Sequence, residues 1–186
     1  MKKLIRTTGL LIVAALISAF LAGPHQAAAA DAASINREAR AALQTLYDTV
    51  PAAKMLGGKA KAILIFPDIF EAGLMVGSQY GDGVLLVDGK SVAYYNIAVA
   101  SYGRQAGMQE FSYAMFLMTD SARTHIDKSG GWEVGFGPGI VVLDEGAAKS
   151  LTTTTAKDDV YAFIFGQKGL KAGIGVKGSK ITRINP

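Results

Sequence analysis

The sequence predicts an α+β domain, on three observations. An apolar stripe at helical spacing lies near the amino end, short apolar runs fill the rest of the chain, and 22 glycines in 186 residues separate or bend those runs. We expect an N-terminal amphipathic helix or helix pair, followed by a glycine-rich, strongly bent antiparallel β-sheet or small barrel. One short helix is expected within that sheet, near residues 120–128.

The first 30 residues have the three-part pattern of a secretory signal peptide. A basic start at Lys2, Lys3 and Arg6 precedes 13 almost wholly apolar residues at 10–22, and Ala28-Ala29-Ala30 offers small side chains for cleavage. A membrane-spanning helix needs about 20 apolar residues, which this run does not reach. We therefore expect cleavage after residue 30, a single domain over residues 31–186, and export to a bacterial periplasm with peripheral membrane association.

The mature composition argues against several classes of function. Beyond residue 30, 16 Lys and Arg face 15 Asp and Glu, so bulk attraction to nucleic acid is not expected. The chain has no cysteine, which excludes thiol catalysis and zinc–thiolate sites. His125 is the one histidine of the mature chain, too few for a zinc site, so we expect no metal, no cofactor and no catalytic residues.

The helical region is predicted from Ser34, whose hydroxyl can cap a helix, to Pro51, which ends it or begins a second helix over residues 52–56. Apolar residues recur between these points at spacings of three and four, and Gly57-Gly58 stops the pattern. Core packing of this stripe is favoured over membrane insertion. The stripe consists of Ile35, Ala39, Ala42, Leu43, Leu46, Tyr47 and Val50.

The strands are predicted between glycine and proline breaks. Pro67 is expected to close the first strand, Gly81-Asp82-Gly83 to make a turn, and Gly103 and Gly107 to break the next pair. Asp88-Gly89 gives the strongest hairpin signal, because a type I′ turn needs positive φ at both central residues. The expected strands are residues 62–66, 73–80, 84–87, 91–100, 111–118, 132–143, 160–165 and 169–184.

Glycine within a strand is costly without a bulge, a sharp bend or a close backbone approach. The motif Ala-Gly-apolar recurs at residues 72–74, 106–108 and 172–174. This recurrence predicts tight coiling of the sheet. A Gly-x-Gly-x-x-Gly match at 173–178 is not a nucleotide site, because the eight residues after it leave no room for the helix that would meet a pyrophosphate.

Two groups of basic residues remain as candidates for binding lipid. Lysine at a sheet edge also guards against edge-to-edge aggregation, and that interpretation is equally open. As a membrane contact, each well-placed basic residue contributes about 1 kcal/mol toward anionic headgroups. The first group is Lys54, Lys59 and Lys61, and the second is Lys168, Lys171, Lys177, Lys180 and Arg183.

Several blocks of the chain resemble one known family. They are Ala60–Pro67, Ala72-Gly73-Leu74, residues 77–85, Tyr94-Tyr95-Asn96, residues 111–118 and a closing block at 165–170. Together they resemble the SYLF domain, a lipid-binding family that includes actin-patch endocytic proteins of yeast. The resemblance implies a non-enzymatic domain that binds phospholipid through an amphipathic helix and a basic surface. Gly103–Met108 departs from the family pattern through Arg104 and Met108, and an exported protein is not expected to meet actin.

The expected function is therefore association with anionic phospholipid or a membrane surface. The alternative is a protein–protein interaction module of the cell envelope, suggested by five tyrosines in the predicted strands, Tyr80, Tyr94, Tyr95, Tyr102 and Tyr113. An enzyme is the least favoured class, because the mature chain holds few titratable groups of catalytic type.

Overall fold

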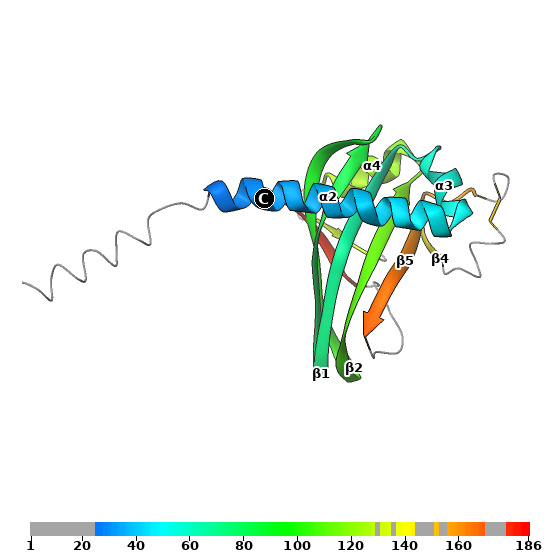
Figure 1. Ribbon diagram of the computed structural model, residues 1–186. Coiled ribbons are helices and arrows are strands. Elements are labelled where there is room, and N and C mark those ends of the chain that lie inside the picture. Colours follow the sequence, from blue (N-terminus) through cyan, green and yellow to red (C-terminus); the bar gives the residue numbers. More distant parts are fainter. Residues whose placement is uncertain (1–24, 129–130, 135–136, 144–150, 153–155, 170–177) are drawn as a thin grey trace, which may run out of the picture.

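The computed structural model describes residues 25–128, 131–134, 137–143, 151–152, 156–169 and 178–186. Two helices come first, two very long strands follow, and a short helix and four short strands complete the chain (Figure 1). The elements are α2 (His25–Thr49), α3 (Pro51–Gly57), β1 (Ala62–Val87), β2 (Lys90–Leu117), α4 (Asp120–Ile126), β3 (Trp132–Glu133), β4 (Ile140–Leu143), β5 (Val160–Gly169) and β6 (Lys180–Ile184).

The long strands β1 and β2 form one antiparallel hairpin that pairs Ala62 with Leu117 at its base and Val87 with Lys90 at its turn. Asp88 and Gly89 have φ values of 50° and 72°, as a type I′ turn requires. The hairpin predicted at Asp88-Gly89 is confirmed.

The breaks predicted within this hairpin are wrong, because the strands run through Pro67, Gly81–Gly83 and Gly103–Gly107 without ending. Register shifts between Phe66 and Ile69 and between Leu74 and Val76 absorb the irregular residues instead. Figure 1 shows the hairpin bent sharply near its middle, so that the two halves of each long strand run in opposite directions.

Two glycines allow the two halves of β1 to approach each other. A Cβ atom on Gly81 would lie 2.6 Å from the Asp68 carbonyl oxygen, and one on Gly83 would lie 2.5 Å from that of Ile65. Real Cβ atoms do not come so near to backbone. These glycines are therefore required by close backbone contact and not by a turn.

The predicted fold class is wrong, since the structure is mostly sheet and the sheet is mixed. Along the sheet the order is β3-β6-β2-β5-β4, with β1 on β2, and β4 pairs parallel to β5. The chain thus forms a curled half-barrel in place of an α+β domain with an antiparallel sheet. The prediction of a single strand over residues 132–143 is also wrong. This segment contains two strands: β3 pairs with β6 at one end of the sheet, and β4 pairs with β5 at the other.

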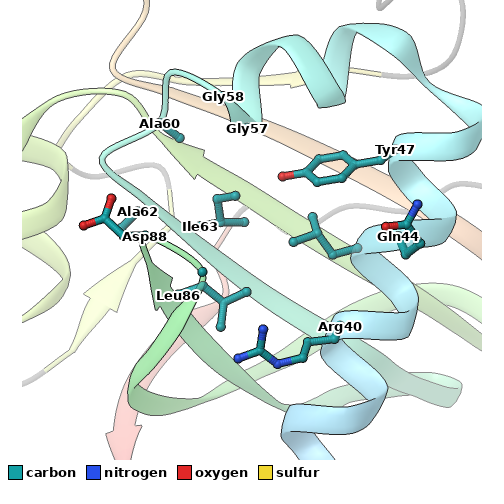
Figure 2. Close-up of a pocket in the computed structure, with 12 residues that line it drawn as sticks. Arg40, Gln44, Tyr47, Gly57, Gly58, Ala60, Ala62, Ile63, Leu86 and Asp88 are labelled. Carbon is teal, nitrogen blue, oxygen red and sulfur yellow. The ribbon is translucent and has the colours of Figure 1, made fainter.

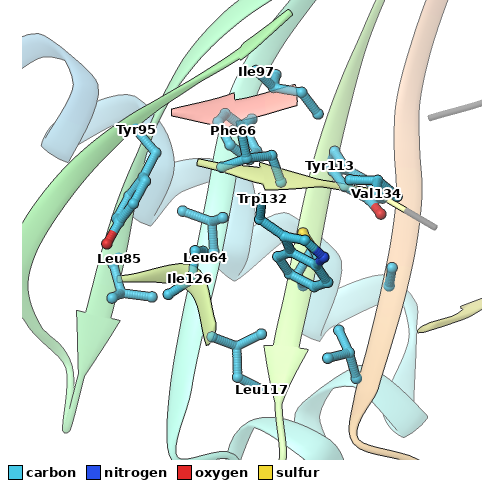
Figure 3. Close-up of a cluster of buried hydrophobic side chains, with 14 of the residues drawn as sticks. Leu64, Phe66, Leu85, Tyr95, Ile97, Tyr113, Leu117, Ile126, Trp132 and Val134 are labelled. Atoms are coloured by element: carbon cyan, nitrogen blue, oxygen red, sulfur yellow. The ribbon is translucent and has the colours of Figure 1, made fainter. Parts of the chain in front are cut away.

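The two faces of the sheet carry separate hydrophobic clusters. One cluster packs α4 and Trp132 against alternate residues of β1 and β2, among them Leu64, Phe66 and Tyr113 (Figure 3). The other cluster packs α2 and α3 against the opposite face, at Ile65, Val84 and Phe116. Both faces are buried because each receives its own layer of helix or loop.

α2 lies across the sheet with its apolar stripe inward (Figure 1). Ile35, Ala39, Leu43 and Leu46 are at most 9% exposed, which confirms core packing of the stripe. Ser34 does not cap the helix as predicted: it lies inside α2 and its hydroxyl donates to Glu38 Oε1 (2.6 Å). The alanine-rich residues before it favour helix, so the helix begins at residue 25 and the capping signal is overridden.

The two shorter helices follow the sequence closely. Pro51 is the first residue of α3, and Thr119 caps α4 by accepting a hydrogen bond from the Ala122 amide (3.2 Å). No helix within the described ranges combines the length and apolarity needed to cross a bilayer.

Candidate functional site

The junction between α3 and β1 exposes the first basic group. The turn after α3 is closed by the amides of Lys59 and Ala60, both of which donate to the Leu56 carbonyl at 2.9 Å. This arrangement leaves Lys54, Lys59 and Lys61 exposed. No acidic side chain of the described residues forms an ion pair with any of the three. No carboxylate in the described part of the chain therefore balances their charge.

A pocket of about 420 Å³ lies beside this junction, between α2 and the Asp88-Gly89 turn, and we call it the hairpin pocket (Figure 2). Leu43, Ile63 and Leu86 supply apolar walls, and Arg40 and Asp88 supply opposite charges. The pocket also includes Ala60 and Ala62, which alternate in sequence with Lys59 and Lys61. Its lining therefore combines apolar surface with one basic and one acidic side chain, and Lys59 and Lys61 adjoin it in the sequence without lining it.

Tyr47 narrows the hairpin pocket from the helix side. Its hydroxyl lies so near Gly57 that a Cβ atom there would overlap it, so glycine at 57 makes room for the phenol. Burial raises the pKa of the Tyr47 hydroxyl above its usual value of 10.0.

A second hollow, of about 640 Å³, lies on the other flank of α2, and we call it the β5 groove. One wall is the end of α2, at Leu46 and Thr49, with Val50 directly after it, and the other is the sheet, at Leu143, Phe163 and Phe165. Its lining ends at Gly166 and Gln167, directly before Lys168. α2 is thus the shared wall of two separate hollows.

The second basic group does not form one surface. Lys171 and Lys177 lie outside the described residues. Arg183 pairs across the sheet with Tyr95 and lies 4.0 Å from Asp127, on the α4 face, whereas its neighbour Lys180 pairs with the exposed Ala98 on the opposite face. Lys180 and Arg183, although both on β6, therefore point to opposite faces of the sheet.

Lys168 is also far from the first group. It pairs with Glu110 on β2, while the Lys61 amide donates to Leu117 of the same strand. Those two partners are seven positions apart along β2, a span of about 23 Å. Lys168 Nζ forms an ion pair with Glu110 Oε1 (3.1 Å), so its charge is locally balanced.

Acidic side chains surround Lys168. Burial, together with the negative charges of Glu110 and Glu38, raises the pKa of Asp68 above its usual 3.8, and Lys168 opposes this only in part. A carboxylate with a raised pKa stabilises the fold when it is protonated, and that stabilisation is lost as the pH rises through the folded-state pKa. At neutral pH, where Asp68 is ionised, its side chain therefore slightly lowers the stability of the folded protein.

Asp68→Asn should raise the melting temperature at pH 7 by about 1–2 °C, an effect limited to about 0.5 kcal/mol because the side chain is partly exposed. At pH 3, where wild-type Asp68 is largely protonated, the two proteins should melt together. Differential scanning calorimetry at both pH values measures this. A variant that is less stable than wild type at pH 7 would contradict the electrostatic argument.

His125 packs its ring edge-to-face against Trp132, with ring centres 5.6 Å apart. Within the described part of the chain, no three His, Asp or Glu side chains are placed to hold a metal ion. Of the five strand tyrosines, Tyr95 and Tyr113 are buried, Tyr94 is half-buried, and Tyr80 is 58% exposed; the side chain of Tyr102 lies outside the described set.

Sequence reasoning did not identify Arg40 or either hollow beside α2. Arg40 follows Ala39 of the buried stripe, so its position at the edge of the helix was readable from the spacing. The walls of the hollows come from segments far apart in the chain, and no sequence pattern signals their meeting.

No family model matches this chain. Beta cell expansion factor A of Aeromonas veronii is 31% identical to it over 150 residues, which are 79% of this chain and 55% of that protein. The chain thus spans about half the length of the curated protein that it matches, and it has a homologue in a bacterium.

Proposed function

We propose that this protein is a non-enzymatic, exported lipid-binding domain of SYLF type that associates with anionic phospholipid through the α3–β1 junction. The observation that carries the proposal is the group of exposed, unpaired lysines beside a pocket with apolar walls. Anionic headgroups would meet Lys59 and Lys61, with about 1 kcal/mol from each well-placed basic residue. Export rests on the pattern of the first 30 residues.

α2 contributes to this surface through its edge and not through its apolar stripe. The stripe is buried against the sheet, so inserting it into a bilayer would require α2 to leave the core. Arg40 extends from the exposed side of α2 to the hairpin pocket (Figure 2). In this proposal the apolar contribution comes from the walls of the pocket.

The double variant Lys59→Gln/Lys61→Gln should bind anionic vesicles about 25-fold more weakly than wild type, at about 1 kcal/mol per lysine. Both side chains are exposed, so the fold should be unaffected. Co-sedimentation with vesicles of mixed phosphatidylglycerol and phosphatidylcholine at low salt measures the loss. Binding of the wild-type protein should also weaken as the salt concentration rises.

The matched control is Lys128→Gln/Lys180→Gln, which removes the same charge from two exposed lysines away from the α3–β1 junction, one just after α4 and one on β6. It should bind nearly as well as wild type. If both double variants lose binding equally, net charge and not the junction determines the association. A wild-type protein that ignores anionic vesicles at low salt would overturn the proposed function.

A second candidate function is favoured by exposed apolar side chains on β1 and β2. Phe70, Tyr80 and Met108 are 49%, 58% and 62% exposed, and Phe70 pairs with Glu110, two residues from Met108 on the same side of β2. Exposed apolar surface often marks a protein contact, and the acids Asp68 and Glu110 near Phe70 would suit a basic partner better than an anionic membrane. Capture of a defined envelope protein from lipid-free extract would support this module, and capture only in the presence of lipid would not.

A further inference from the structure

We infer that the β5 groove holds the single acyl chain of a zwitterionic amphiphile, with the headgroup at Lys168 and Glu110. This inference rests on the proposed lipid-binding function and adds a second mode to it. At the α3–β1 junction the protein would meet a membrane surface, whereas in the groove it would enclose one lipid molecule.

The walls of the groove suit a hydrocarbon chain. Leu46 of α2 and Val50, the residue between α2 and α3, line it together with Phe163 and Phe165 of β5. The α2 wall also includes Thr49, but its hydroxyl already donates to the Thr45 carbonyl (2.8 Å). The volume of about 640 Å³ lies within the range of small-molecule sites, about 300–1,000 Å³. The groove is therefore large enough for a ligand and offers it mainly apolar contacts.

A bulge in β5 turns a charged side chain toward the end of this groove. Phe165 pairs with Ser112 and Lys168 pairs with Glu110, so three steps on β5 match two on β2. Gly166 permits the extra residue through its φ of 65°. Cross-strand partners share a face, and Ser112 and Glu110 are two residues apart, so Phe165 and Lys168 point to the same side. In a regular strand they would point to opposite sides.

The charges at that end favour a zwitterion over a simple anion. Lys168 Nζ lies 3.1 Å from Glu110 Oε1, and the side chains are 75% and 41% exposed. Asp68 is close enough for its pKa to respond to both groups, and Glu38 adds a further negative charge. An anionic head alone would meet more acid than base. A phosphoethanolamine head offers its phosphate to Lys168 and its ammonium to the acidic side chains. Binding it would separate Lys168 from Glu110, which costs little because an exposed ion pair is weak.

The test uses monomeric lysophosphatidylethanolamines of increasing chain length, added to the full protein without vesicles and followed by isothermal titration calorimetry. Affinity should rise about four-fold per methylene while the chain lies within the groove. A one-to-one complex is expected, and it should bind more tightly than a fatty acid of equal chain length. Affinity that does not depend on chain length would overturn the inference, and tighter binding of the fatty acid would overturn the zwitterionic head.

Thr49→Phe should fill the groove from its α2 wall and weaken binding at least ten-fold. The matched control is Thr124→Phe on α4, because Thr124 is also an exposed helical threonine whose hydroxyl donates to a carbonyl four residues earlier. Wild-type affinity in Thr49→Phe would overturn the groove as the site. If monomeric lipid does not bind while anionic vesicles still do, the inference about the β5 groove fails and the proposed membrane contact stands. If monomeric lipid binds and vesicles do not, the membrane contact fails and the groove stands.

Discussion

Phe116→Ala is expected to lower the free energy of unfolding by about 3–5 kcal/mol. Phe116 is fully buried beneath α2, with its ring 6.4 Å from that of Tyr47 and 5.5 Å edge-to-face from that of Phe163. Removing the ring opens a cavity where helix, β2 and β5 meet, and the helix cannot move in to fill it without losing its own contacts. A total stability of about 5–15 kcal/mol makes this a severe loss.

Urea unfolding followed by circular dichroism measures the change as a lower midpoint with an unchanged slope. Val142→Ala is the control, since Val142 lies on the same sheet but is 49% exposed, and it should change stability by no more than about 0.5 kcal/mol. A Phe116→Ala midpoint equal to that of the control would show that α2 does not depend on this contact. α2 forms a wall of both hollows. If Phe116→Ala loosens the packing of α2, lipid binding at each hollow should therefore weaken.

Gly83→Ala is expected to destabilise the protein by about 1–3 kcal/mol, or more if the backbone cannot shift. The new methyl would lie 2.5 Å from the Ile65 carbonyl oxygen and equally close to the Phe66 ring. The ring could rotate slightly, but the carbonyl belongs to the first half of β1, whose backbone is held by its pairing with β2, and has little freedom. The two halves of β1 would be forced apart where the hairpin folds on itself.

Gly139→Ala provides the comparison, because a Cβ atom there would meet nothing within 4 Å. Thermal melting should leave this control close to wild type while Gly83→Ala melts several degrees lower. Equal melting temperatures for the two variants would mean that the two halves of β1 are not held together at Gly83.

The local elements could be predicted because their signals are local. The Asp88-Gly89 turn, the short helix near residues 120–128, the start of α3 at Pro51 and the inward stripe of α2 each depend on a few neighbouring residues. The candidate site could be predicted only in part. Lys59 and Lys61 were found from sequence, but whether a basic residue has an acidic partner depends on pairing, as Lys168 and Arg183 show.

The sequence by itself determined the tight Asp88-Gly89 hairpin, the inward packing of the first helix, and which basic residues gather near the α3–β1 junction. The tertiary structure alone decided that Gly81 and Gly83 serve a close approach in place of a turn, that β4 joins β5 in parallel, and that two hollows flank α2. The physical reason is range. Propensity and capping act over a few residues, whereas bulges, strand pairing and cavity walls depend on segments that meet only when the whole sheet has formed.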